Sequence, residues 1–330
     1  MIFDVKMSRR VVVATHGHCF DGLSSAVLFT RLIRHLNPDE PFLYRYHSCG
    51  YGPGLNGVDP KLLVGDINAI LDFRFSPSKA LTWYFDHHVS AFPGKDDRPT
   101  YETASNVEPR QMFHDGAYTS CTKLIADIGC ERFGLDLEPV RELVRWADMI
   151  DSAAFPNAEM AVSRKDPVLQ LMTVVEHHGD DAFLTELVVQ LLEQPIERVA
   201  SSAVVKSMFE PIHRGFENYV KLVSDRAKEV RGVVLVDLSD VQIEVAAKFV
   251  TYALYPNSVY SVLLSRSKTK CKISIGYNPW AKTARTHNIA GICERHGGGG
   301  HPVVGAISMP AHEVETARAL AQSIADELGQ

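Results

Sequence analysis

The sequence lacks the features of several classes of protein. No apolar run approaches the roughly 18 residues that a membrane-spanning helix requires, and Val11–Val13 is too short for the core of a signal peptide. The six cysteines include no C-x-x-C pair, which argues against a zinc knuckle or a secreted disulfide framework. We find no internal repeat or low-complexity tract. The sequence therefore predicts a soluble cytoplasmic protein with no membrane partner.

The sequence also has little excess charge of either sign. Lys and Arg total 34 against 40 Asp and Glu, a formal net charge of −6. Such mild acidity offers no broad basic surface to long duplex nucleic acid, so a polyanionic ligand should be short or meet a local patch. The 330 residues, 45% of them hydrophobic and 22% charged, suggest about two folded domains.

Short apolar runs alternate with helical periodicity in the first half of the chain. This pattern predicts an α/β fold with a parallel sheet and helices on both faces. We expect strands over Val11–Thr15, Lys61–Gly65 and Leu81–Phe85, a helix along the apolar face Ala26–Leu36, and another helix after Pro139 that carries Asp148.

The second half of the chain has a different pattern of apolar residues. Residues 155–230 are mostly helical in pattern, with expected breaks at Pro195 and Pro211. We then expect a strand over Val233–Val236, a helix over Val241–Leu254, a hairpin over Val259–Ile275 and a closing helix over Ala311–Leu328. The predicted organisation is an N-terminal domain over 1–195, a helical connector over 196–230 and a smaller α/β domain over 231–330.

Polar side chains follow all three strands predicted in the first half. In open α/β sheets, ligands bind beyond the carboxyl ends of the strands. Imidazole and carboxylate together suit Mn²⁺, Fe²⁺ or Zn²⁺ better than Ca²⁺, and one ion does not need this many ligands. The pattern predicts a two-metal site that serves in-line attack of water on phosphorus. The side chains are His16, His18, Cys19 and Asp21 after the first strand, Asp66 after the second, and Asp86, His87 and His88 after the third.

A run of four glycines, Gly297–Gly300, precedes His301 near the C-terminus. Successive glycines permit positive φ and close backbone approach, so their N–H groups can form a concavity that holds an anion. A flexible hairpin loop is the simpler interpretation of the same run. Both interpretations remain open at this point.

These motifs together resemble the DHH phosphoesterases that carry a C-terminal DHH-associated domain. The resemblance rests on Tyr84–His88 at a strand end, on His16–Asp21 after the first strand, and on Gly297–His301. The family includes nano-RNases, single-strand exonucleases, cyclic-dinucleotide phosphodiesterases, phosphoadenosine phosphate phosphatases, pyrophosphatases and exopolyphosphatases. The resemblance implies a phosphoesterase domain followed by a substrate-binding domain.

The resemblance also implies roles for individual residues. The implied metal ligands are Asp66 as the bridge between the two metals, His87, Asp21 and Asp148 on one metal, and His16 on the other. His88 would lie beside the scissile phosphate or behind the metal ligands, and Asp86 would orient a histidine or the loop. The implied substrate contacts are Gly298, Gly299, Gly300 and His301, with Arg266 or Arg285 as a stand-in for an arginine that the family often places on the upstream hairpin.

The first motif departs from the family pattern. The family usually offers a histidine and two aspartates there, whereas this chain has Asp21 alone. Alignment on Asp21 favours His18 as the substitute ligand, and Cys19 is the competitor. Imidazole in place of carboxylate removes one negative charge, which predicts a preference for Mn²⁺, with Fe²⁺, Co²⁺ or Zn²⁺ as alternatives, over Mg²⁺.

The expected activity is hydrolysis of short single-stranded oligonucleotides to 5′-mononucleotides, because a cleft between small domains admits an end but not a duplex. Linear or cyclic dinucleotides, phosphoadenosine phosphate and polyphosphate are alternative substrates. A nucleotide-binding sensor that has lost catalysis is the alternative that is not an enzyme. A homodimer is a further expectation.

Overall fold

The computed structural model describes residues 8–50, 57–241, 243 and 249–330. The chain divides into two compact units, which we describe separately. Unit 1 contains the residues up to Ala154 together with Lys165–Phe209, and unit 2 contains Phe155–Arg164 together with Glu210–Gln330. The helix α9 (Ala203–Arg226) continues from one unit into the other, within the region where the sequence predicts a connector.

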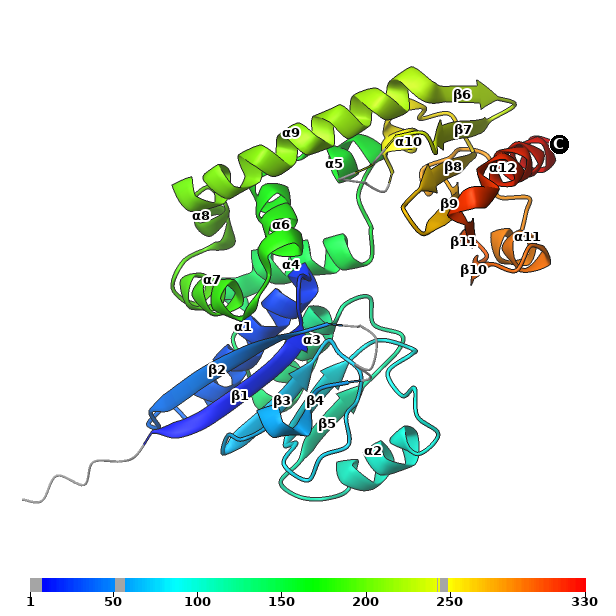
Figure 1. Ribbon diagram of the computed structural model, residues 1–330. Helices are drawn as coiled ribbons and strands as arrows, with labels where there is room; N and C mark the ends of the chain where they lie inside the picture. Colours follow the sequence, from blue (N-terminus) through cyan, green and yellow to red (C-terminus); the bar gives the residue numbers. More distant parts are fainter. Residues whose placement is uncertain (1–7, 51–56, 242, 244–248) are drawn as a thin grey trace, which may run out of the picture. The chain divides into compact units, whose positions relative to one another are not determined.

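Unit 1 is built on a five-stranded parallel sheet, as the sequence predicts (Figure 1). The strand order is β2-β1-β3-β4-β5, so β1, β3 and β4 lie side by side in its centre. The strands are β1 (Arg9–His16), β2 (Phe42–Cys49), β3 (Ile67–Leu71), β4 (Trp83–Asp86) and β5 (Gln111–His114).

Helices cover both faces of this sheet. Alternate side chains of β4 point to opposite faces, as the period of a strand requires. Trp83 packs edge-on against Phe29 of α1, with ring centroids 5.6 Å apart, whereas Tyr84 packs against Tyr101 of α2 at 5.8 Å. The helices of unit 1 are α1 (Phe20–Leu36), α2 (Asp97–Ser105), α3 (Cys121–Phe133), α4 (Arg141–Asp151), α6 (Pro167–His178), α7 (Asp181–Glu193) and α8 (Ile196–Ala200).

The strand predicted over Lys61–Gly65 is wrong. Residues Pro60–Leu62 form a short 3₁₀ turn. Asp59 caps this turn, since its side chain accepts a hydrogen bond from the amide of Lys61. The strand is instead Ile67–Leu71, which is buried along its whole length between β1 and β4, as a central parallel strand should be. The residue at its carboxyl end is therefore Asp72.

Two further expectations change in the helical region. Pro195 precedes α8, as predicted, but Pro211 lies inside α9 and does not end it. Of the helix predicted over Val241–Leu254, the structure describes α10 (Val250–Leu254), and most of the preceding residues lie outside the described part of the chain.

Unit 2 contains a mixed six-stranded sheet in the order β10-β11-β9-β8-β7-β6. The predicted hairpin is confirmed, because β8 and β9 pair in antiparallel fashion, and only the β7–β8 pair of this sheet is parallel among the residues described. The elements are β6 (Ala227–Val230), β7 (Val233–Leu238), β8 (Tyr260–Arg266), β9 (Lys270–Tyr277), β10 (Gly299–His301), β11 (Val304–Pro310), and the helices α5 (Ala158–Ser163), α11 (Ile289–Arg295) and α12 (Val314–Leu328).

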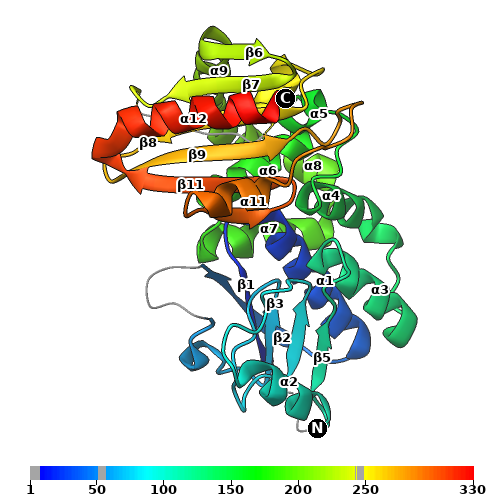
Figure 2. The same ribbon diagram turned by 90° about the vertical axis from the view of Figure 1, so that its right-hand side faces the viewer.

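The unit 2 sheet is also covered on both faces. Figure 2 shows α12 lying across β8 and β9, where it buries Ala317, Ala321 and Ile324 as its spacing predicts. The opposite face packs Val234 and Val236 of β7 against α9. Within the described residues of both units, no helix is long and apolar enough to cross a lipid bilayer.

Candidate metal centre

Three neighbouring strands of unit 1 deliver polar side chains to one edge of the sheet. Strand β1 ends at His16, β3 ends before Asp72, and β4 ends at Asp86, which His87 and His88 follow. Because the three strands are parallel, their carboxyl ends meet at the same edge, where an open α/β sheet binds its ligands.

Asp72 lies at the centre of this edge. Its Oδ2 is 3.8 Å from Nδ1 of His16 and 3.6 Å from Sγ of Cys19. Its other oxygen, Oδ1, is 3.5 Å from Nε2 of His87 and 3.8 Å from Nδ1 of His88. One buried carboxylate is thus shared between two groups of side chains, which is the arrangement that a bridging ligand needs.

A further group forms around His87. Its Nε2 lies 3.8 Å from Oδ2 of Asp21 and 3.3 Å from Oδ2 of Asp151. Asp21 comes from the first turn of α1 and Asp151 from the last residue of α4. Within each of the three groups His16–Cys19–Asp72, Asp72–His87–His88 and Asp21–His87–Asp151, the ligand atoms lie within 4.8 Å of one another.

The surrounding structure fixes the orientation of the central side chains. Asp21 accepts hydrogen bonds from the backbone amides of Cys121 and Thr122 at the N-terminus of α3, at 2.7 and 2.9 Å. Nδ1 of His87 lies 3.1 Å from the carbonyl oxygen of Tyr118. If Nδ1 donates to that carbonyl, Nε2 carries the lone pair that faces the carboxylates, which is the tautomer of a metal-binding histidine.

Asp86 is fully buried and holds the loop that follows β4. Its Oδ1 lies 2.7 Å from Nδ1 of His88 and accepts from the amide of His87 at 2.9 Å. The hydroxyl of Tyr84 donates to its Oδ2 at 3.0 Å. With both oxygens engaged in this way, Asp86 is placed to orient His88.

The crowding of carboxylates perturbs proton affinities across the group. Burial and the charges of Asp72 and Asp151 raise the pKa of Asp21 well above its usual range. Burial and Asp72 raise the pKa of Asp151 to about 6. Burial opposes the charging of His87, but the carboxylate of Asp72, 3.5 Å from its Nε2, and the charge of Asp21 outweigh this and raise its pKa to about 9. Asp21, Asp151 and His87 therefore all bind a proton more tightly in the fold than the isolated side chains do.

The donor set fits divalent metal ions. Oδ1 of Asp72 and Nε2 of His87 are buried and make no hydrogen bond, a costly state for polar atoms unless a cation completes their environment. Nitrogen, oxygen and sulfur donors together suit Mn²⁺, Fe²⁺, Co²⁺ or Zn²⁺. The side chains of the three groups, which could hold ions here, are His16, Cys19, Asp21, Asp72, His87, His88 and Asp151.

Three predicted ligands lie apart from these groups. Asp66 precedes β3 at the opposite edge of the sheet, is exposed, and accepts from the amide of Arg10. Asp148 lies one turn before Asp151 on α4 and accepts from the hydroxyls of Thr119 and Ser120. Asp72 and Asp151, and not these two aspartates, belong to the groups described above.

His18 is the third predicted ligand that lies apart from these groups. Its backbone is left-handed, with a φ of 53°, its side chain is exposed, and its Nδ1 lies 3.2 Å from the carbonyl oxygen of Glu176. The extended backbone of the next residue, Cys19, directs the thiol to Asp72 instead. The sequence leaves open whether His18 or Cys19 is the substitute ligand. Of the two, Cys19 lies within the ligand groups and His18 does not.

The predicted substrate contacts belong to unit 2. The backbone amides of Gly297 and Gly298 donate to carbonyls of α11, and Gly299–His301 form β10, so this run is neither an open loop nor a free row of amides. A Cβ on Gly298 would lie 2.3 Å from the carbonyl oxygen of Ala306, so its close approach to β11 requires glycine. All three residues of β10, Gly299, Gly300 and His301, are exposed.

Arg285 binds backbone carbonyl groups beside the Gly297–His301 segment. Its guanidinium donates to the carbonyl oxygens of His287 and Pro302, at 2.7 and 2.9 Å. It therefore ties the loop before α11 to the end of the β10 segment.

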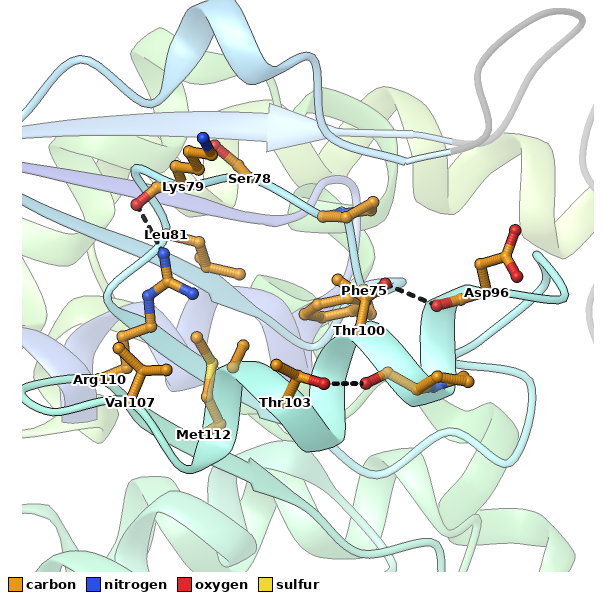
Figure 3. A pocket seen from close by; sticks show the side chains of 13 residues that line it. Phe75, Ser78, Lys79, Leu81, Asp96, Thr100, Thr103, Val107, Arg110 and Met112 are labelled. Atoms are coloured by element: carbon orange, nitrogen blue, oxygen red, sulfur yellow. Dashed lines mark hydrogen bonds between the residues drawn. The ribbon is translucent and has the colours of Figure 1, made fainter.

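A separate pocket lies near α2, with a volume of about 550 Å³. Figure 3 shows Phe75, Leu81 and Met112 on its walls, with Arg110 at the rim, where the guanidinium donates to the carbonyl oxygen of Lys79. None of the metal-ligand candidates among the described residues lines it.

Comparisons with solved structures identify the fold. No family model and no curated protein sequence matches the chain. Among solved structures, the pGpG-specific phosphodiesterase PggH of Vibrio cholerae is similar, with a TM-score of 0.66 and 19% identity over 96% of this chain and 99% of that one. The DHH domain of a member of the s1p family of ribosomal proteins matches with a TM-score of 0.56 and 12% identity, over 96% and 87%.

A third match is RecJ from Thermus thermophilus in complex with Mn²⁺, with a TM-score of 0.51 and 12% identity, over 97% of this chain and 52% of that one. This chain has the DHH phosphoesterase fold. The DHH motif itself, Asp86–His88, lies at the carboxyl edge of the parallel sheet, within the candidate metal centre.

Proposed function

We propose that this DHH protein is a metal-dependent phosphodiesterase that hydrolyses short linear nucleotides, with linear dinucleotides as its preferred substrates. The observation that carries the proposal is Asp72, a buried carboxylate shared between two groups of histidine, cysteine and aspartate ligands. A centre of this kind serves hydrolysis at phosphorus, because bound divalent ions lower the pKa of water and neutralise charge on the phosphoryl oxygens.

The residues of the chain have distinct parts in this reaction. Asp72 and His87 hold the ligand set together, and Asp21 and Asp151 supply the remaining oxygen donors. His88 is the catalytic residue that faces the phosphate, since its side chain is 35% exposed while its Nδ1 lies against Asp86. With Nδ1 donating to Asp86, Nε2 is available to hydrogen-bond a phosphoryl or leaving oxygen. Asp86 acts through His88 as a positioning residue.

The preference for dinucleotides rests on a comparison with one similar protein. PggH is a pGpG-specific phosphodiesterase, and its match to this chain extends over nearly the full length of both proteins. The net charge of −6 agrees with a substrate that has few phosphates. This favours linear dinucleotides over the short single-stranded oligonucleotides expected from the sequence, which become the second candidate.

We assign substrate contacts to the exposed edge of unit 2. Gly299, Gly300 and His301 would meet the phosphate or sugar, with Gly298 setting the close approach of this edge to β11. Arg285 would support this edge through its bonds to the flanking carbonyls.

A substrate panel tests the proposal. Purified protein with Mn²⁺ is incubated with linear dinucleotides, longer oligonucleotides, cyclic dinucleotides, phosphoadenosine phosphate and polyphosphate, and the products are separated by chromatography. We expect kcat/KM for a linear dinucleotide to exceed that for any longer oligonucleotide by about 10-fold or more, through contacts to both ends of the shorter chain. Binding of nucleotides without hydrolysis under any divalent metal would instead indicate the sensor.

A further inference from the structure

The two sides of Asp72 offer different donor chemistry. On the Oδ2 side, His16 supplies an imidazole and Cys19 a thiol. Around His87, Asp21 and Asp151 supply carboxylates and no sulfur. The first side is the softer set, and the second is the harder one.

We propose, on the basis of the metal centre argued above, that Cys19 is a sulfur ligand and makes the His16 side of the centre selective for Zn²⁺, Fe²⁺ or Co²⁺ over Mg²⁺. Cys19 stands where the sequence pattern lacks a carboxylate. A thiolate carries the same charge as the carboxylate that it replaces, so the site keeps its negative charge and changes its softness. The preference over Mg²⁺ then follows from the softness of sulfur, and not from the loss of a negative charge that imidazole at this position would cause.

The backbone explains why the thiol points into the centre. Cys19 is the N-cap residue of α1, with φ −132° and ψ 133°, a position where a side chain commonly bonds to the first turn of the helix. The Cys19 side chain makes no such capping bond, and its Sγ lies 3.6 Å from Oδ2 of Asp72. The loop before α1 thus presents sulfur to the shared carboxylate.

An independent feature points to a cation bound at Asp72, on the side of the carboxylate that faces His87. Asp72 is only 1% exposed, yet its Oδ1 makes no hydrogen bond, and its φ of 52° holds the residue in the left-handed region. A strained and buried carboxylate with an unsatisfied oxygen is the pattern of a ligand position. Among the described residues, Cys19 is also the one cysteine of the six in such a group, because Cys121 donates to the carbonyl of Phe85 and Cys130 is exposed on α3.

Cobalt provides a readout that does not depend on turnover. A thiolate bound to Co²⁺ gives a near-ultraviolet charge-transfer band, whereas oxygen and nitrogen ligands do not. We expect the wild-type protein and the matched control Cys130→Ser to develop this band in proportion to added Co²⁺. Cys19→Ser and Cys19→Asp should lose the band, and Cys19→Asp should improve binding of Mg²⁺ relative to Zn²⁺ by about 10-fold or more.

A second measurement uses the wild-type protein alone. Saturating Zn²⁺ should protect Cys19 from alkylation, as peptide mass spectrometry detects, and leave Cys130 as reactive as before. If wild-type protein binds Co²⁺ and hydrolyses nucleotides but shows neither the band nor the protection, Cys19 is not a ligand and the proposed function stands. If it binds no divalent metal and hydrolyses nothing, both proposals fail.

Discussion

The two ends of strand β3 carry aspartates in opposite environments. Asp66, before the strand, is exposed and accepts the amide of Arg10. Asp72, after the strand, is buried and leaves one oxygen without a hydrogen bond. The residue type is the same at both ends. What differs is the edge of the sheet, because only at the carboxyl edge do the neighbouring strands also deliver histidines and a second carboxylate.

The largest expected effect comes from neutralising the aspartate at the carboxyl edge. Asp72→Asn removes the shared carboxylate charge, so hydrolysis of a linear dinucleotide with Mn²⁺ should fall on the order of 10³-fold or more. Metal bound per chain, measured by elemental analysis after gel filtration, should fall with it. The matched variant Asp66→Asn should keep activity within about 2-fold, because it changes an exposed side chain outside the metal groups. Equal losses in the two variants would contradict the assignment of Asp72.

A smaller effect separates two aspartates one turn apart on α4. Asp151→Asn removes an oxygen donor 3.3 Å from Nε2 of His87, so metal affinity measured by calorimetry should fall about 10- to 100-fold. Asp148→Asn keeps an acceptor for Thr119 and Ser120 and should leave metal affinity within about 3-fold, with at most a small drop in Tm. The reverse ranking would return Asp148 to the metal shell that the resemblance implies.

Much of the fold could be predicted from the sequence because its signals are local. The apolar run of β1, the apolar face of α1 and the closing helix α12 follow from period and burial alone. The pattern misplaces the strand before Asp72 because Leu62 and Leu63 are as apolar as β3 itself. Pro60 and the cap at Asp59 favour a turn at Leu62 and Leu63, and the strand forms after them.

The site was predictable where it depends on strand ends and not where it depends on backbone angles. His16 and His87 lie at or directly after a strand, so their edge of the sheet could be inferred. The choice between His18 and Cys19 depends on the left-handed φ of His18, which a sequence does not show. The sequence names Asp148 and not Asp151 for a related reason, since the two lie three residues apart on one helix and only the fold shows that Asp151 is the one near His87.

The smallest expected effect concerns the pH dependence of stability in the metal-free protein. The pKa of His87 is about 9 in the fold, against about 6.5 for an unperturbed histidine. A raised pKa means that the folded state binds the proton more tightly. The stabilisation is therefore complete below about pH 6.5 and is lost as the pH rises through about 9. Asp151, whose pKa is about 6, releases its proton below about pH 6.5, so its titration does not contribute to the change in stability within this window.

We expect the Tm of chelator-treated protein, measured by calorimetry, to fall by several degrees across this window. His87→Gln should flatten that part of the curve, because its amide does not titrate. Asp66→Asn, at the other end of β3, should leave the slope of the wild-type protein unchanged. Saturating Zn²⁺ should reduce the fall, since metal binding requires the deprotonated ligands and so gains strength as the pH rises. A slope that metal and His87→Gln both leave intact would show that the carboxyl edge does not bind this proton, and the electrostatic contrast between the two ends of β3 would then have to be abandoned.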